Sequence, residues 1–374
     1  MEKIRFDDFV KLNRGFDLPD SKIEDGVYPV VASTNVKAYH STFKVNGPMV
    51  VTGRSGSLGA VQYIDGKCWP LNTTLYVKDF KGNNPRYVYY FLKTMHLEQY
   101  NAGAGVPTLN QNHLHSLKIE IHEKEKQSRI ASILSAYDNL IENNNKRIRL
   151  LEQMAENLYK EWFVRFRFPG HENAEFENGL PKGWKREKIC KVYNTCSGGT
   201  PSRVNEDFYS NGSIPWVKTG ELQDCLIHDA EEFITEDALK RSSAKLLPNH
   251  SLLMAMYGVN IGKLGILRKE MTCNQAVCAF LPKTADQTFY YLYFYLKGIR
   301  NYLLSISFGA AQQNLSQALI KNVRIMIPHN DTLQKFENKV SCYFDQISIY
   351  QRQNEQLTRQ RDLLLPRLMS GKLE

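Results

Sequence analysis

The chain has 374 residues, of which 42% are hydrophobic and 23% charged, a composition that excludes a disordered chain. Its 48 Lys and Arg against 39 Asp and Glu give a formal net charge of +9, which favours a polyanionic partner such as nucleic acid. The N-terminal segment does not resemble a signal peptide, and no window holds the roughly 20 apolar residues of a membrane helix. We therefore expect a soluble, cytoplasmic protein.

Residues 1–121 are predicted to form one α/β domain. Near its end, Leu117, Ile119 and Ile121 alternate at period two, which is typical of a half-buried strand. Earlier in the chain we expect strand 28–31, strand 49–51, a glycine loop at 53–59, an amide-bearing turn at 72–74, strand 75–77, an aromatic-rich helix at 87–93 and a small-residue loop at 102–105.

Heptad spacing of apolar residues then predicts one long helix over 122–164. The spacing is interrupted by Asn144, where an apolar residue is expected. A helix of roughly 39 residues is about 58 Å long, which is more than a single small domain can cover. The apolar positions are Ile130, Leu134, Tyr137, Ile141, Ile148, Leu151, Ala155, Leu158 and Trp162.

Pro169 and Gly170 break this helix, and residues 165–180 are predicted to be a linker. Residues 181–328 then repeat the order of the first domain at an offset of roughly 200 residues. The two domains differ most at 11–45 against 191–245. The repeated segments are strands 214–217 and 252–254, glycine loop 258–262, amide-bearing turn 274–276, strand 277–280, aromatic helix 290–297, small-residue loop 308–311 and the alternating residues Val323, Ile325 and Ile327.

A second long helix is predicted over 329–374, with Asp331 as its N-cap. Asn354 and Arg361 interrupt its stripe. We predict that the two helices pair as an antiparallel coiled coil, with Asn144 and Asn354 fixing the register. Two unrelated surface helices, or a homodimeric coiled coil, are the alternatives. The apolar positions are Leu333, Phe336, Val340, Tyr343, Ile347, Tyr350, Leu357, Leu364 and Leu368.

No catalytic motif is complete. Residues Asn84–Tyr87 resemble the Asn-Pro-Pro-Tyr motif of adenine N6-methyltransferases but lack its second proline, so we interpret them as a helix start. Gly258–Lys263 is one residue short of a phosphate loop, and Leu264 replaces the magnesium-binding Ser or Thr. His113 and His115, expected on an extended segment, lack a third metal ligand, and the seven cysteines form no CxxC pair. We predict a non-catalytic chain without metal or cofactor.

The predicted loops carry side chains that could recognise DNA. Asn, Gln and Arg can read base edges, whereas Lys, Ser and Thr commonly bind phosphates. The predicted DNA contacts of the first domain are Arg14, Lys37, Tyr39, His40, Arg54, Ser55, Ser57, Gln111 and Asn112. Those of the second are Arg203, Lys218, Thr219, Tyr257, Asn260, Lys263, Gln312, Gln313 and Asn314.

In this order, the motifs resemble those of the DNA-specificity subunit of type I restriction–modification enzymes, over nearly the whole chain. Unlike members with an N-terminal conserved helix, this chain opens almost directly in the first domain. The segments that carry the resemblance are VTGRSGSLG (51–59), WPLNTTLYV (69–77), VPTLN (106–110), LPKGW (180–184), SGGTPS (197–202), IPWVKTGEL (214–222) and LLPRLMSGKL (364–373).

The resemblance implies an α+β fold with two pseudo-twofold-related globular α/β target-recognition domains, separated by a long antiparallel two-helix coiled coil. Each domain would read one half of a bipartite, asymmetric sequence in double-stranded DNA. Two methyltransferase and two restriction subunits would be the partners, and they would hold S-adenosylmethionine, ATP and Mg²⁺. The alternatives are a non-enzymatic coiled-coil scaffold protein and a part of a fused modification enzyme.

Overall fold

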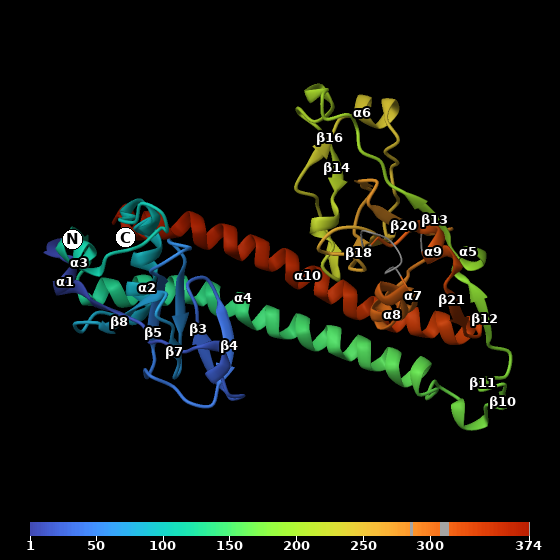
Figure 1. The fold of residues 1–374 in the computed structure, drawn as a ribbon, viewed down its shortest axis with the longest axis horizontal. Coiled ribbons are helices and arrows are strands. Elements are labelled where there is room, and N and C mark those ends of the chain that lie inside the picture. The colour runs from blue at the N-terminus through green and yellow to red at the C-terminus, as the bar shows by residue number, and fades with distance from the viewer. Residues whose placement is uncertain (285–286, 307–313, 374) are drawn as a thin grey trace. The chain divides into compact units, whose positions relative to one another are not determined.

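The computed structural model describes residues 1–284, 287–306 and 314–373. These residues form two compact units (Figure 1). Unit 1 contains residues 1–145 and 351–374, and unit 2 contains residues 146–350. The division cuts both long helices, so each unit is one domain together with a stretch of α4 (Lys124–Tyr159) and a stretch of α10 (Asn330–Met369).

The domain of unit 1 is built from a β-sheet in the order β2-β8-β5-β6, a second sheet in the order β4-β3-β7 and the pair β1-β9. Helix α2 packs on β5 and β6. The elements are β1 (Glu2–Arg5), α1 (Phe6–Phe9), β2 (Lys11–Arg14), β3 (Tyr28–Val31), β4 (Val36–His40), β5 (Met49–Gly53), β6 (Val61–Ile64), β7 (Trp69–Pro70), β8 (Thr74–Asp79), α2 (Pro85–Thr94), α3 (Gln111–Ser116) and β9 (Lys118–Ile121).

The domain of unit 2 repeats these pairings. Its sheets have the orders β13-β20-β17-β18-β15 and β16-β14-β19, and β12 pairs with β21. The elements are β12 (Lys185–Lys188), α5 (Ile189–Val192), β13 (Asn194–Ser197), β14 (Ile214–Val217), β15 (Cys225–Ile227), β16 (Phe233–Ile234), α6 (Glu236–Arg241), β17 (Leu252–Ala255), β18 (Leu264–Leu267), β19 (Thr272–Cys273), β20 (Val277–Leu281), α7 (Tyr290–Gly298), α8 (Arg300–Ile306), α9 (Gln317–Asn322) and β21 (Arg324–Ile327).

The predicted duplication of an α/β domain is therefore confirmed, and the second copy is larger. Strand β15 and helix α6 are additions that lie between the counterparts of β3 and β5. They fall largely within the stretch 191–245, where the two domains were expected to differ most. The predicted small-residue loop at 308–311 lies outside the described residues.

Helices α4 and α10 pair inside each unit, and they run antiparallel. In unit 1, Leu134 of α4 shares a core with Leu365 of α10, and the amide of Asn144 donates to Asn354 Oδ1 at 3.0 Å. In unit 2, Arg147 donates to the Tyr350 hydroxyl at 3.3 Å, and Ala155 lies in one core with Phe344. As residue numbers rise along α4, the residue numbers of the contacting partners on α10 fall. The helices therefore run antiparallel, which confirms the predicted pairing.

Helix α4 ends in a π-helical turn over Lys160–Val164, after which Phe166 and Gly170 have positive φ angles and reverse the chain. The following segment is more ordered than a linker. Phe168 is 8% exposed and its ring lies 5.0 Å from that of Trp184. A hairpin of β10 (Phe176–Glu177) and β11 (Leu180–Pro181) continues it. Aromatic packing therefore fixes much of 165–180 on the core of unit 2.

Two local predictions need correction. Helix α10 begins before Asp331, because the His329 carbonyl already accepts the first helical hydrogen bond from Leu333 N (3.0 Å). His113 and His115 lie on helix α3 and not on an extended segment, since the Asn110 side chain caps that helix by accepting from Asn112 N.

By contrast, the interpretation of Asn84 as a helix start is confirmed. Its side chain accepts from the backbone N–H groups of Arg86 and Tyr87 at the beginning of α2. Within residues 1–284, 287–306 and 314–373, no helix combines the length and apolar character that crossing a bilayer requires.

Candidate nucleic-acid interface

Backbone hydrogen bonds tie five loop segments of the first domain into one rigid group, which we call the loop frame. It joins the segments around Gly15, Val31, Arg54, Leu71 and Leu109. The bonds are Gly15 N to Thr74 O (3.1 Å), Phe16 N to Pro70 O (2.8 Å), Leu71 N to Val31 O (2.9 Å), Arg54 N to Thr73 O (2.8 Å) and Leu109 N to Arg54 O (2.8 Å).

The second domain has the same frame, bond for bond. Its members are Gly198 N to Val277 O (3.3 Å), Gly199 N to Cys273 O (2.9 Å), Asn274 N to Val217 O (3.0 Å), Met256 N to Ala276 O (2.8 Å) and Leu315 N to Met256 O (2.9 Å). The correspondence is therefore fixed residue by residue. Arg54 matches Met256, and Asn72 matches Gln275, one position away from the match that sequence order alone suggested.

Each glycine loop reaches its tip at a residue with positive φ, Gly56 at 84° and Gly258 at 80°. A Cβ atom at either position would have no atom within 4 Å, so glycine is favoured there by backbone conformation and not by crowding. Beside the tips, Ser57 and Val259 are exposed, and Val259 is fully so. Backbone and small side chains at this edge are open to a partner.

Several residues predicted from the first domain's sequence do meet at this frame. Arg54 is half-buried and its guanidinium donates to Asn72 O at 3.5 Å, while Ser55 is half-buried beside it. Arg14 stands at the end of β2 next to Gly15, exposed and 3.7 Å from an oxygen of Asp17. Arg54, Ser55, Ser57 and Arg14 are thus one surface group.

The predicted DNA contacts on β4 differ in whether their side chains are exposed or buried. Alternation along the strand places Lys37 and Tyr39 on the exposed side, with Lys37 Nζ 2.6 Å from Asp20 and Tyr39 57% exposed. His40, which was predicted to contact DNA, lies on the buried side of the strand. It is 5% exposed, its Nδ1 accepts from Glu24 N at 3.0 Å, and its ring lies against Trp69.

Gln111 and Asn112 belong to the first turn of α3 and not to a loop. Asn112 is exposed, whereas Gln111 is half-buried and its Oε1 has no hydrogen-bond partner among the described residues. The structural match of Gln111 is Gln317, the first residue of α9, which bonds to Ser197 and Thr195 on β13. Gln111 is therefore not matched by the predicted group at 312–314.

In the second domain, the polar residues of the glycine loop bind the chain itself. The Asn260 amide donates to Thr219 O (3.1 Å) and Gly220 O (2.9 Å), which anchors the loop to the turn after β14. Lys263 Nζ lies 3.2 Å from Asp224. Strand β18, and no helix, follows Lys263, so the segment is not a phosphate loop. Tyr257 stays 37% exposed and available.

The remaining predicted cations of this domain converge on one carboxylate. Lys218 Nζ is 2.9 Å and Arg203 Nη2 2.6 Å from Glu232, and the Arg203 guanidinium also lies over the rings of Tyr209 and Trp216. The hydrogen bond that the Lys218 ammonium donates to the Glu232 carboxylate raises the pKa of Lys218 above its ordinary value. Of the last predicted group, Asn314 is exposed, while Gln312 and Gln313 lie outside the described residues.

Two side-chain contacts at the frames were missed from the sequence. The Asn72 amide donates to Asp17 in the first domain, and the Thr200 hydroxyl donates to the Gln275 carbonyl oxygen in the second. The four residues occupy matching positions. Asp17 comes directly after Gly15 and Phe16, and Thr200 comes directly after Gly198 and Gly199, whose N–H groups make the corresponding bonds of the two frames. The repeated amide-bearing turn was visible in the sequence, but its partner segment was not.

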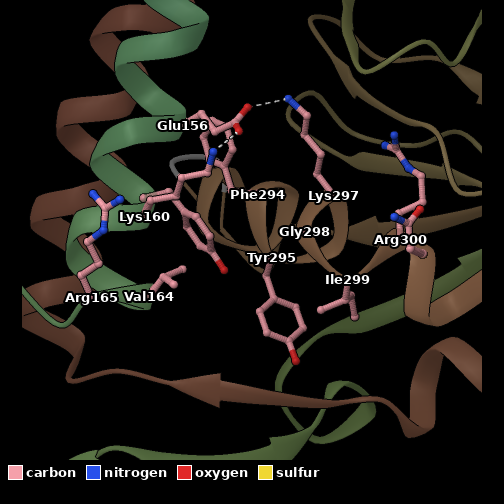
Figure 2. Close-up of a pocket in the computed structure, with 12 residues that line it drawn as sticks. Glu156, Lys160, Val164, Arg165, Phe294, Tyr295, Lys297, Gly298, Ile299 and Arg300 are labelled. Atoms are coloured by element: carbon pink, nitrogen blue, oxygen red, sulfur yellow. Dashed lines mark hydrogen bonds and ion pairs between the residues drawn. The ribbon is translucent and has the colours of Figure 1, made fainter.

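A pocket of about 620 Å³ lies in unit 2 between the end of α4 and helices α7 and α8. Figure 2 shows Glu156 reaching both Lys160 and Lys297 across its upper rim, at 2.6 Å and 3.0 Å. Arg165 and Arg300 also line it. Since Glu156 pairs with two of these cations, the pocket is a junction between helix and domain.

Arg300 connects this junction to the glycine loop. Its Nε donates to Gly262 O at 2.8 Å, and its guanidinium pairs with Asp224. Burial alone would raise the pKa of Asp224, but the ion pairs with Arg300 and Lys263 outweigh burial and hold it below its ordinary value. A charged Asp224 therefore fixes the base of the loop in place. No cluster of three or more His, Cys, Asp or Glu suited to a metal ion occurs in the described part of the chain.

Comparison with known proteins gives consistent results. The family model of the type I restriction modification DNA specificity domain matches residues 1–153 and 181–359. The chain is 30% identical over 298 residues to the type I restriction enzyme MjaIX specificity subunit of Methanocaldococcus jannaschii, covering 77% of this chain and 68% of that protein. With the MjaVIII specificity subunit of the same organism, identity is 25% over 401 residues, covering 100% and 92%.

A solved structure shares the fold. The S subunit of a type I restriction–modification system from M. genitalium aligns with a TM-score of 0.67 and 18% identity, over 98% of this chain and 96% of that one. Each of the two matched stretches of the family model contains one loop frame and the first part of the long helix that follows it.

Proposed function

Because this chain belongs to the type I restriction modification DNA specificity family, we propose that its two domains read the two halves of a bipartite, asymmetric DNA target. The observation that carries the proposal is the duplicated loop frame. Its backbone is the same in both domains, yet the side chains at its edge differ, with Arg54, Ser55 and Ser57 against Met256, Tyr257 and Val259. One scaffold with two chemistries suits two different half-sites.

The chain itself is proposed to be non-catalytic. It would direct two methyltransferase subunits and two restriction subunits, which would hold S-adenosylmethionine, ATP and Mg²⁺. Exposed apolar residues on the long helix support such docking. Ile133 and Leu140 in unit 1 are 37% and 51% exposed, and Leu150 and Met154 in unit 2 are 59% and 49% exposed. Apolar side chains so exposed on a helix are typical of a surface that a partner covers.

The test is methylome sequencing of a methylation-deficient host that expresses the chain with its cognate methyltransferase subunit. A control host lacks the chain. We expect a two-part motif with methylated adenines that appears only when the chain is present. A soluble complex of the two proteins that produces no new motif would contradict the proposal and favour a scaffold.

Salt dependence separates the DNA-binding function from the scaffold alternative without a cofactor. Binding of duplex DNA that neutralises six to ten phosphates should weaken by about 10³- to 10⁵-fold between 50 and 200 mM salt. A scaffold that binds only protein has no such slope. The measurement is fluorescence anisotropy of the complex with labelled duplex DNA at several salt concentrations.

A further inference from the structure

We propose that Asn72 and Gln275 are the base-reading side chains of the two domains, and that each amide reads an adenine in its half-site. The inference rests on the proposed function and deepens it. It assigns one matching residue in each domain, and it follows from the loop frames and the side-chain contacts at their edges. Neither residue was among those predicted from the sequence.

Both amides stand on backbone that is pinned on either side. In the first domain, Leu71 N bonds to Val31 O, and Thr73 O accepts from Arg54 N and Ser55 N (2.8 and 3.1 Å), with Asn72 between them. In the second domain, Gln275 lies in the same way between the bonds of Asn274 and Ala276. A side chain that starts from fixed backbone loses less freedom when it binds, which favours specific readout.

Each amide is also oriented by a polar neighbour from the matching segment. Asp17 accepts from the Asn72 amide nitrogen, and Thr200 donates to the Gln275 oxygen. An amide has two N–H donors and two lone pairs on its oxygen. One contact therefore leaves both amides with a donor and an acceptor, the pair that binds adenine N7 and N6 in the major groove.

The exposure of the two amide side chains is suited to reading a base. Gln275 is exposed and Asn72 is half-buried, each at the edge of its frame beside an open glycine tip. Two other polar side chains nearby are engaged within the chain, Asn260 with the turn at 219–220 and Lys218 with Glu232. In the glycine loops, the residue type changes between domains at the positions of Arg54, Ser55 and Ser57, which are Met256, Tyr257 and Val259 in the second domain. The matched residues Asn72 and Gln275, by contrast, both carry an amide side chain.

Asp17 supports the same interpretation by its charge. An exposed carboxylate at a surface that faces phosphates is unfavourable, and its side chain is 74% exposed. Its presence is explained if it holds the Asn72 amide while Arg14, 3.7 Å away, offsets the charge. In the second domain, Thr200 performs the orienting role without a charge.

The experiment repeats the methylome measurement with Asn72→Ala and Gln275→Ala in the full chain with its methyltransferase subunit. We expect Asn72→Ala to relax one base pair, an A·T pair, in one half-site by roughly 5- to 150-fold in discrimination, the range for loss of a bidentate contact. The other half-site and the spacer should not change. Gln275→Ala should relax one A·T pair in the opposite half-site.

Matched controls are Asn46→Ala and Asn322→Ala, which remove exposed amides outside the frames and should leave the motif unchanged. Full methylation with an unchanged motif in Asn72→Ala and Gln275→Ala would overturn the inference while the bipartite motif of the unmodified chain upholds the proposed function. No motif with the unmodified chain would overturn the proposed function itself.

Asn72→Gln covers the case in which Asn72→Ala abolishes methylation at every site. This variant keeps the amide on a longer side chain. Methylation restored with an altered preference at a single base pair supports the inference. Methylation restored with the original motif, or absent in both variants, would show that Asn72 serves the whole assembly and would overturn it.

Discussion

We expect protonation of His115 at acid pH to reduce the stability of the first domain. His115 lies on α3, and its Nε2 accepts from Leu12 N at 3.0 Å, so the neutral imidazole is the form that the fold needs. Burial lowers the pKa of His115 below its ordinary value of 6.5, and the opposing effect of Asp7 is smaller. His122, also in this domain, has its pKa lowered by burial as well.

The lowered pKa of His115 determines how the stability of the fold changes with pH. A histidine whose folded-state pKa is depressed stabilises the fold above pH 6.5, and this stability is lost as pH falls below that value. Protonation removes the acceptor of the buried Leu12 N–H, at a cost of about 1–3 kcal/mol. We expect thermal denaturation to show a falling Tm between pH 7.5 and pH 5, and a smaller fall in His115→Gln. Equal falls in both proteins would contradict this assignment.

Residue by residue, the sequence located the loops of the frame better than it placed the side chains within them. Arg54, Ser55 and Ser57 were chosen as candidates because they lie beside a glycine loop. His40 was misplaced because the inward side of β4 depends on Trp69, which is distant in sequence. Asn72 was missed because its partner Asp17 is separated from it by 55 residues of the chain.

At the scale of elements, the two long helices carry polar residues in their seam for two different reasons. Asn144 and Asn354 bind each other, and Asn354 also donates to Asn145 at 2.8 Å. Arg361, which interrupts the second heptad pattern, pairs with Asp138 at 2.6 Å, and Tyr90 of α2 donates to the same carboxylate at 2.5 Å. Arg361 thus joins the helix pair to its domain.

The asparagine pair can be tested by a double-mutant cycle. Asn144→Leu removes the donor to Asn354 Oδ1 and should reduce the free energy of unfolding by about 1–3 kcal/mol. Asn144→Leu combined with Asn354→Leu should recover that loss, because two leucines pack in the seam. The measurement is urea denaturation of the full chain. Additive losses in the double variant would show that the two amides do not act as a pair.

For the whole molecule, the helices are proposed to set the length of unread DNA between the half-sites. One heptad inserted after Asn145 and another after Tyr350 preserves the seam and adds ~10.5 Å to each helix. The required spacer should then change by about 3 base pairs, at ~3.4 Å each, with both half-sites unchanged.

Methylome sequencing of the heptad variant measures this directly. A heptad inserted in α4 alone is the control, since it leaves the seam residues of the two helices unmatched and should reduce stability. If the double insertion keeps the original spacer while methylation continues, the helices do not set the distance.

The sequence by itself determined the repeated domain and the two long helices, because local periodicity and glycine loops reflect contacts with near neighbours in the chain. It also determined the family, since ordered motifs over the whole length are specific. Only the tertiary structure decided which side chains the loop frame leaves free. Asn260, Lys218 and Lys263 are committed to partners within the chain, and Asp17 meets Asn72, through contacts between segments that sequence spacing does not bring together.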